Sequence, residues 1–229
     1  MSTLILLRHG ESIWNKENRF TGWADPDLSE KGKDEACRAG QLLKSFSLDF
    51  DICFTSVLKR AIKTHLYAAE EINRLWVPVV RDWRLNERHY GALQGLNKAE
   101  TTDKYGAEQV KLWRRSFDVK PPQVSNADPR YPAHDIRYKE VDLSLLPHGE
   151  SLEDTVARVI PCWNELILPE IQKKKRVMIA AHGNSLRALV MYLQQMTPAE
   201  IVYEEIPTGR PLIYELGTDL RPERRYYLG

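Results

Sequence analysis

The stretch Thr3-Leu4-Ile5-Leu6-Leu7-Arg8-His9-Gly10-Glu11-Ser12 runs from a short apolar segment directly into an arginine, a histidine and a glycine. An uninterrupted apolar run such as Thr3–Leu7 is typical of a strand buried on both faces of a parallel sheet. Ligands of such sheets bind beyond the carboxyl ends of the strands, where Arg8 and His9 fall, and the glycine lets the backbone turn sharply. The stretch therefore predicts a strand that delivers a cation and an imidazole to an anion site.

A second apolar segment ends in the same way. Val177–Ala181 leads into His182-Gly183-Asn184-Ser185, with Arg187 shortly after it. Carboxyl ends of parallel strands meet at one edge of a sheet, so we expect His9 and His182 to approach each other there. Two imidazoles at one edge can face a single phosphoryl group from different sides.

The remaining pattern alternates strand and helix signals, which predicts an α/β three-layer sandwich with a mostly parallel central sheet flanked by helices. Apolar residues at helical spacing predict crossover helices, with a bend at Pro161 in the last of them. Thr197-Pro198-Ala199-Glu200 has the cap, proline and glutamate of a helix start. The other predicted segments are strands at Asp51–Phe54 and Val77–Val80 and helices at Ser29–Phe46, residues 58–66 and Ser151–Lys173.

Composition limits the function classes. A chain of 229 residues with 42% hydrophobic residues predicts one domain, residues 1–229, in which the proline-containing segment 117–146 is a long excursion over the active site. The 33 basic and 32 acidic side chains nearly cancel, which argues against nucleic acid as a partner. No apolar run approaches the roughly 20 residues of a membrane span, and three cysteines without metal-ligand spacing favour a reduced, cytoplasmic setting.

Longer blocks of sequence add a family resemblance to this pattern. Across essentially its whole length the chain resembles the cofactor-dependent phosphoglycerate mutases of the histidine phosphatase superfamily. The blocks that carry the resemblance are Arg8–Ser12, Trp14–Trp23, Thr55–Ala61, Leu85–Leu93, Leu96–Thr101, Trp113–Arg115 and Ile206–Gly209.

The resemblance and elementary chemistry give the same roles to the two strand ends. A neutral imidazole is a competent nucleophile toward phosphorus, so His9 is expected to carry the phosphoryl group. Negative charge spreads over the equatorial oxygens of that group, and fixed donors stabilise it without a metal. We expect those donors to be Arg8, Arg60 and His182, assisted by Gly183 and Asn184. From charge spacing alone, Arg60 would be a solvated helix residue; its role comes from the resemblance.

The resemblance also implies a proton carrier and a substrate wall. A mutase must protonate a leaving oxygen and deprotonate an attacking hydroxyl, and Glu87 is the residue expected to do both. Arginine forks fit carboxylates and phosphates well. The residues that the resemblance assigns to substrate binding, besides those named above, are Ser12, Asn15, Thr21, Gly22, Arg88, His89, Tyr90, Lys98, Arg114 and Arg115.

The expected activity is the glycolytic and gluconeogenic interconversion of 3- and 2-phosphoglycerate, an intramolecular phosphotransfer primed by 2,3-bisphosphoglycerate. Three alternatives stay open: a phosphatase of the same fold, a bisphosphoglycerate mutase, and a non-catalytic binding protein. The intact Lys98 and Arg114-Arg115 blocks argue against the phosphatase, and the presence of His9 and Glu87 argues against the last. The resemblance further implies a homodimer or homotetramer that binds only small phosphoglycerates.

Overall fold

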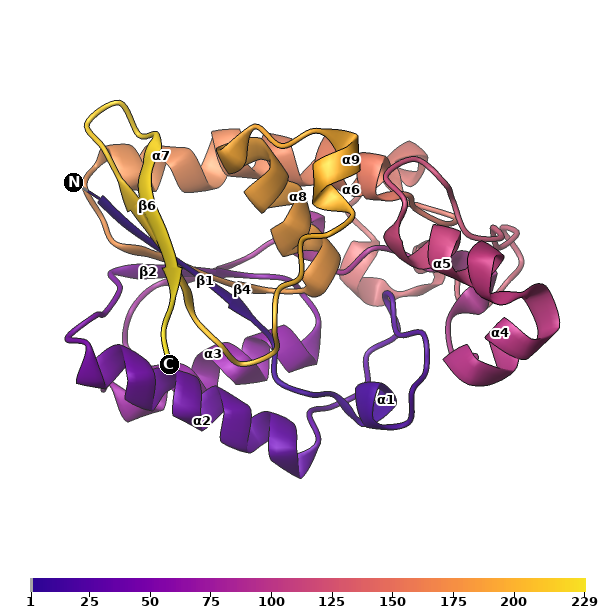
Figure 1. The fold of residues 1–229 in the computed structure, drawn as a ribbon, viewed down its shortest axis with the longest axis horizontal. Helices are drawn as coiled ribbons and strands as arrows, with labels where there is room; N and C mark the ends of the chain where they lie inside the picture. The colour runs from indigo at the N-terminus through magenta and orange to yellow at the C-terminus, as the bar shows by residue number, and fades with distance from the viewer. Residues whose placement is uncertain (1) are drawn as a thin grey trace.

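A computed structural model, which describes residues 2–229, shows a six-stranded sheet in the order β3-β2-β4-β1-β5-β6 (Figure 1). The four strands that the sequence predicted, β1 to β4, run parallel to one another, with β3 at one edge of the sheet. The last two strands are antiparallel and extend the sheet beyond β1. The strands are β1 (Ser2–Arg8), β2 (Ile52–Thr55), β3 (Val79–Arg81), β4 (Val177–Ala181), β5 (Leu212–Leu216) and β6 (Pro222–Tyr227).

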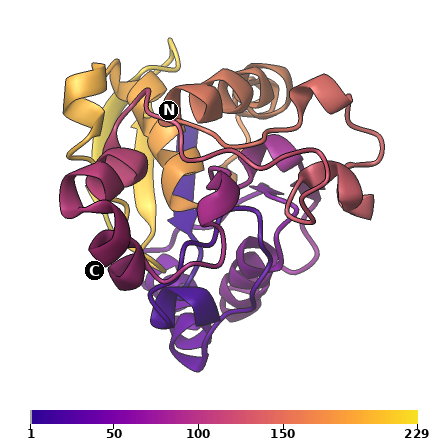
Figure 2. The ribbon, with the colours of Figure 1, turned by 90° about the vertical axis from the view of Figure 1, so that its right-hand side faces the viewer.

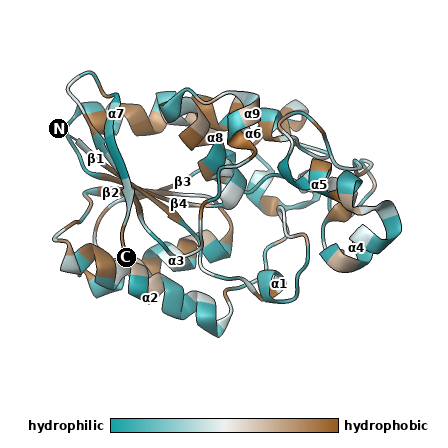
Figure 3. Ribbon diagram, in the orientation of Figure 1, coloured by the Kyte–Doolittle hydropathy of each residue, from teal (hydrophilic) through white to brown (hydrophobic). Residues whose placement is uncertain are grey.

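Helices cover both faces of the sheet, as the alternating pattern predicted. In Figure 1, α2 (Glu30–Ser45) and α3 (Lys59–Glu71) lie below it, and α6 (Leu152–Cys162), α7 (Leu168–Gln172) and α8 (Gly183–Gln194) lie above it. The apolar sides of these helices face the strands (Figure 3). The smaller helices are α1 (Ile13–Lys16), α4 (Lys98–Tyr105), α5 (Ala107–Arg115) and α9 (Pro198–Ile201).

The central strand β1 contributes to both halves of the core. Successive side chains of a strand point to opposite faces, so Leu4 and Leu6 pack under α6 and α8, whereas Ile5 and Leu7 pack against α2 and α3. All four are fully buried. An apolar run without alternation is therefore what a strand in this central position requires.

The predicted helix at Ser151–Lys173 has an interruption near its centre. Ser151 caps its start, and Pro161 lies inside α6, immediately before a π-helical turn at Trp163–Ile167 that leads into α7. Proline removes one amide donor from the helix, and a widened turn accommodates the loss. The apolar stripe continues through the interruption, because Trp163 and Ile167 are both buried.

Residues 117–146 form irregular chain with three short 3-10 turns and run to one side of the layers (Figure 2). Their apolar side chains Val124, Tyr131 and Tyr138 pack with Trp23 in a separate small cluster. The segment thus buttresses the loop after β1. Within residues 2–229, no helix combines the length and the apolar character needed to cross a membrane.

Candidate active site

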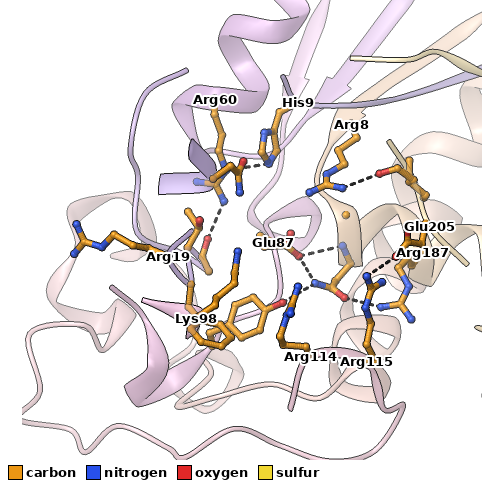
Figure 4. Close-up of a pocket in the computed structure, with 18 of the residues that line it drawn as sticks. Arg8, His9, Arg19, Arg60, Glu87, Lys98, Arg114, Arg115, Arg187 and Glu205 are labelled. Carbon is orange, nitrogen blue, oxygen red and sulfur yellow. Dashed lines mark hydrogen bonds and ion pairs between the residues drawn. The ribbon is translucent and has the colours of Figure 1, made fainter. Parts of the chain in front are cut away.

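A cavity of about 410 Å³ lies beyond the carboxyl ends of β1, β2 and β4, where the sequence placed the site (Figure 4). The loop after β1 reaches it by passing close to α2: a β-carbon on Gly10 would lie 2.1 Å from the carbonyl oxygen of Gly32, so this crossing requires glycine. The lining residues are Arg8, His9, Asn15, Arg19, Phe20, Thr21, Gly22, Arg60, Glu87, Tyr90, Lys98, Arg114, Arg115, Gly183, Asn184, Arg187, Glu205, Ile206 and Pro207.

His9 is held in one tautomer. Its Nδ1 lies 2.7 Å from the carbonyl oxygen of Gly10, which can only accept, so Nδ1 carries the proton. Its Nε2 accepts a hydrogen bond from Nε of Arg60 at 3.3 Å. Burial, followed by the charges of Arg60 and Arg8, lowers the pKa of His9 well below 6.5. The ring is therefore neutral at physiological pH, and Nε2 has the lone pair that a nucleophile toward phosphorus needs, available once phosphorus replaces Arg60 as its partner.

Arg60 is fully buried in the first turn of α3, although its charged neighbours in sequence resemble a solvated helix face. Its terminal nitrogens donate to the carbonyl oxygens of Ala24, at 2.9 Å, and Gly22, at 2.8 Å. Burial is the main reason that its pKa falls to about 10, so the side chain stays charged at neutral pH. The loop after β1 thus fixes this guanidinium beside His9.

His182 meets His9 from the end of β4. The two ring centroids are 4.9 Å apart and the rings are inclined by 61°, edge toward face. Nε2 of His182 lies 2.7 Å from Oγ of Ser56, which follows β2. Burial lowers the pKa of His182 well below 6.5, and the charge of Arg60 lowers it further. Both imidazoles are therefore uncharged, and the cationic charge around them comes from arginine.

Glu87 lies between His9 and the outer cations of the cavity, among them Lys98 and Arg114 (Figure 4). Its Oε1 accepts three hydrogen bonds, from the amide of Arg88 at 2.8 Å and from the amide and the side-chain nitrogen of Asn184 at 3.1 and 2.9 Å. Oε2 accepts no hydrogen bond from residues 2–229. Oε2 is consequently the oxygen left to exchange a proton with a ligand.

The outer part of the cavity is strongly cationic. Arg187, on α8, donates to Oδ1 of Asn184 at 2.9 Å and thereby orients the amide that binds Glu87. Burial lowers the pKa of Lys98, and the charges of Arg114 and Arg8 lower it further. Among the described residues that line the cavity, seven have basic side chains and two have carboxylates, Glu87 and Glu205. The basic residues are Arg8, Arg19, Arg60, Lys98, Arg114, Arg115 and Arg187.

Four of the predicted site residues do not line the cavity. Ser12 caps α1, where its Oγ accepts from the amide of Asn15 at 3.1 Å. Arg88 and His89 are buried behind Glu87, and burial lowers the pKa of His89 to about 4. His182 is fully buried behind His9. The other predicted residues all line the cavity.

Six lining residues were not predicted. Arg187 had a usable signal, because it stands about one helical turn after Gly183 on a helix whose first residues face the site. Arg19 and Phe20 lie within a block that we used only for the resemblance. The remaining three form one segment, in which Ile206 and Pro207 belong to another block of the resemblance and Glu205 directly precedes it; none of them was assigned a role: Glu205, Ile206 and Pro207.

The comparisons with known proteins agree with this geometry. A family model described as histidine phosphatase superfamily (branch 1) matches residues 4–217. A mycobacterial glucosyl-3-phosphoglycerate phosphatase in complex with VO3 is 25% identical, with a TM-score of 0.73 over 99% of this chain and 97% of that one. An alpha-ribazole phosphatase from Shigella flexneri is 21% identical, with a TM-score of 0.71 over 97% and 94%, and so shows the fold alone.

Proposed function

Because the chain belongs to the histidine phosphatase superfamily, whose members transfer phosphoryl groups through a phosphohistidine, we propose that it interconverts 3- and 2-phosphoglycerate through a phosphate on His9. Membership of the superfamily supports the transfer of a phosphoryl group through a phosphohistidine. The identity of the acceptor, a phosphoglycerate rather than water, is our proposal.

The observation that carries the proposal is the cationic outer wall. A phosphatase that releases phosphate to water needs donors around one phosphoryl group, and Arg8 and Arg60 supply them. Lys98, Arg114 and Arg115, the last paired with Glu205, add a second group of cations on the side of Glu87 away from His9 (Figure 4). Phosphoglycerate has a carboxylate and a phosphate, and this second group suits the anion that does not react.

Two buried guanidinium hydrogens of residues that line the cavity support anion binding there. Nε of Arg8 and Nε of Arg187 are each buried without a hydrogen-bond partner among residues 2–229. An unpaired buried donor is costly, so such groups suit a ligand that supplies the acceptor. Both residues line the cavity, and 2,3-bisphosphoglycerate, which has two phosphates and a carboxylate, offers acceptors to such donors; when bound, it supplies the first phosphate on His9.

In the proposed reaction, Nε2 of His9 forms a bond to phosphorus while the bond from phosphorus to the leaving oxygen breaks. Oε2 of Glu87 gives its proton to that oxygen. In the reverse sense, Glu87 removes the proton of the attacking hydroxyl as it bonds to phosphorus, and His9 leaves as a neutral ring. Arg8 and Arg60, which line the cavity beside His9, stabilise the charge of the transferring group, and His182 supports His9 from behind.

A second candidate is a phosphatase, in which water replaces the glycerate hydroxyl. The names of similar solved structures favour it, since they include a glucosyl-3-phosphoglycerate phosphatase and an alpha-ribazole phosphatase. The two candidates share His9, Glu87 and the phosphohistidine, and they differ only in what attacks it.

One experiment separates the two. The enzyme is incubated with labelled 2,3-bisphosphoglycerate, its acid-labile label is assigned to His9 with His9→Ala as control, and 3-phosphoglycerate is then added. The mutase predicts that the label leaves on phosphoglycerates much faster than it leaves as inorganic phosphate. If 3-phosphoglycerate does not accelerate loss of the label and inorganic phosphate is the product, the phosphatase is the function.

A further inference from the structure

Arg158, on α6, does not line the cavity, yet its guanidinium is tied to the segment that carries Glu87. Nε donates to Glu150 at 2.6 Å, and one terminal nitrogen donates to the carbonyl oxygens of Arg84, at 2.7 Å, and Asn86, at 2.9 Å. The other donates to the carbonyl oxygen of Glu87, at 3.0 Å, and to Glu150, at 2.9 Å. Arginine has five N–H donors, so this one has none left for a substrate.

Glu150 completes the attachment on the other side of Glu87. Its carboxylate accepts from the amide of His89 at 2.7 Å, and its own amide donates to the carbonyl oxygen of His89 at 2.8 Å. The indole nitrogen of Trp23 adds a bond to the carbonyl oxygen of Glu87 at 2.6 Å. The ion pair itself is buried, with side-chain exposures of 8% for Arg158 and 4% for Glu150.

This segment needs such an attachment because residues 86–90 belong to no helix or strand. Buried carbonyl and amide groups outside regular structure must find other partners. Here the partners of three successive peptide groups come from one ion pair. The position of the Glu87 backbone is therefore determined by Arg158 and Glu150 rather than by the sheet.

We propose that Arg158 and Glu150 are positioning residues that keep Oε2 of Glu87 within reach of the reacting oxygen. The inference rests on the proposed role of Glu87 in proton transfer. It holds whether a phosphoglycerate or water accepts the phosphoryl group, because both reactions need the same proton carrier.

The test compares two leaving groups in the first turnover, when His9 becomes phosphorylated. The oxygen of p-nitrophenyl phosphate leaves as a stable anion and needs little help from an acid, whereas the alkyl oxygen of a phosphoglycerate needs the proton of Glu87. Arg158→Lys keeps the charge but cannot reach five acceptors, and Glu150→Gln keeps the shape but loses the charge. Both variants should phosphorylate His9 from 2,3-bisphosphoglycerate at least tenfold more slowly, while the p-nitrophenol burst stays within about twofold of wild type.

A purely structural role would slow both substrates equally. Arg176→Lys is the matched control: this arginine is also forked to an aspartate, Asp51, but at the amino end of β4, away from the cavity. It should change neither rate. Trp23→Phe removes one donor to the carbonyl oxygen of Glu87 and should give the same selective loss of rate, but a smaller one. It serves as the test variant if Arg158→Lys or Glu150→Gln does not fold.

The outcomes separate this inference from the proposed function. Folded variants in which both rates fall together, or in which neither falls, overturn the positioning role. If Glu87→Gln shows no difference between the two leaving groups, the role of Glu87 itself is wrong. If the wild-type enzyme does not transfer phosphate to 3-phosphoglycerate, the proposed mutase activity is wrong. The comparison of leaving groups still holds, because it measures only the phosphorylation of His9.

Discussion

Acidification should destabilise this protein strongly, because it buries four neutral histidines. Burial is the largest cause of a lowered pKa at His9, His65, His89 and His182, and it brings those of His65 and His89 to about 4. In the unfolded chain the same side chains titrate near the ordinary value of about 6.5. Between pH 7.5 and 5.5, therefore, the unfolded chain gains protons that the folded protein does not.

The sign follows from this difference in proton uptake. The free energy of unfolding falls as pH falls wherever the unfolded state binds more protons. Over these two pH units, each histidine that stays neutral in the folded state contributes a loss of about 1–1.5 kcal/mol, a factor of ten in the unfolding equilibrium. The four together give roughly 5 kcal/mol, a large part of the about 5–15 kcal/mol typical of a folded domain. Carboxylates with a lowered pKa, such as Asp128, lose their contribution only below pH about 4 and do not act in this window.

The assay is urea unfolding, followed by tryptophan fluorescence, at pH 7.5 and 5.5. Phosphate is left out of the buffer because an anion that binds the folded site would stabilise it. His65→Leu is the informative variant: both ring nitrogens of His65 are buried without a hydrogen-bond partner among residues 2–229, and the ring packs 5.7 Å from that of Phe50. It should remove about a quarter of the pH dependence. Equal unfolding free energies at both pH values, or an unchanged pH dependence in His65→Leu, would refute the reasoning.

Three further predictions concern the site and the loop that builds it. In Glu87→Gln, the three donors that bind Oε1 should hold the amide oxygen, so the NH2 group faces the cavity and cannot act as an acid or a base. Steady-state kcat should fall by about 10²–10⁴ with little change in KM. A KM that rises as steeply as kcat falls would contradict this. In Gly32→Ala, the new β-carbon would lie 2.0 Å from the carbonyl oxygen of Glu11, so thermal unfolding should show a loss of about 1–3 kcal/mol; an unchanged Tm would show that the crossing relaxes freely. Because seven basic groups face two carboxylates, raising NaCl from roughly 50 to 300 mM should raise KM for phosphoglycerate severalfold at constant kcat, and a salt-independent KM would count against a cationic binding wall.

The part of the site that sequence reasoning placed correctly comes from strand ends. His9 and His182 each follow an apolar strand, and parallel strands bring their carboxyl ends to one edge, so their meeting could be predicted without coordinates. Arg60 shows the limit of local pattern. Its charged neighbours indicate a solvated helix face, and only the family resemblance placed it in the site, where it is fully buried.

Arg88 and His89 were predicted wrongly because they lie outside helices and strands, where no regular period indicates which way a side chain points. Within the block from Glu87 to Tyr90, the first and last side chains line the cavity, whereas Arg88 and His89 point into the interior. Arg158 could not be found from its position in the sequence either. It lies 71 residues after Glu87, and its three bonds to this segment go to backbone carbonyl groups, which every residue possesses.

The two halves of the cavity are built by different parts of the fold. His9 and His182 follow the ends of sheet strands, and Arg60 lies on the crossover helix α3, so the sheet and this helix position the groups that handle the phosphoryl group. Lys98, Arg114 and Arg115 stand on α4 and α5, a helical pair that lies outside the three layers (Figure 2). Function depends on sites placed on a fold rather than on the fold itself. Changes in α4 and α5 should therefore alter what accepts the phosphoryl group while the phosphorylation of His9 persists.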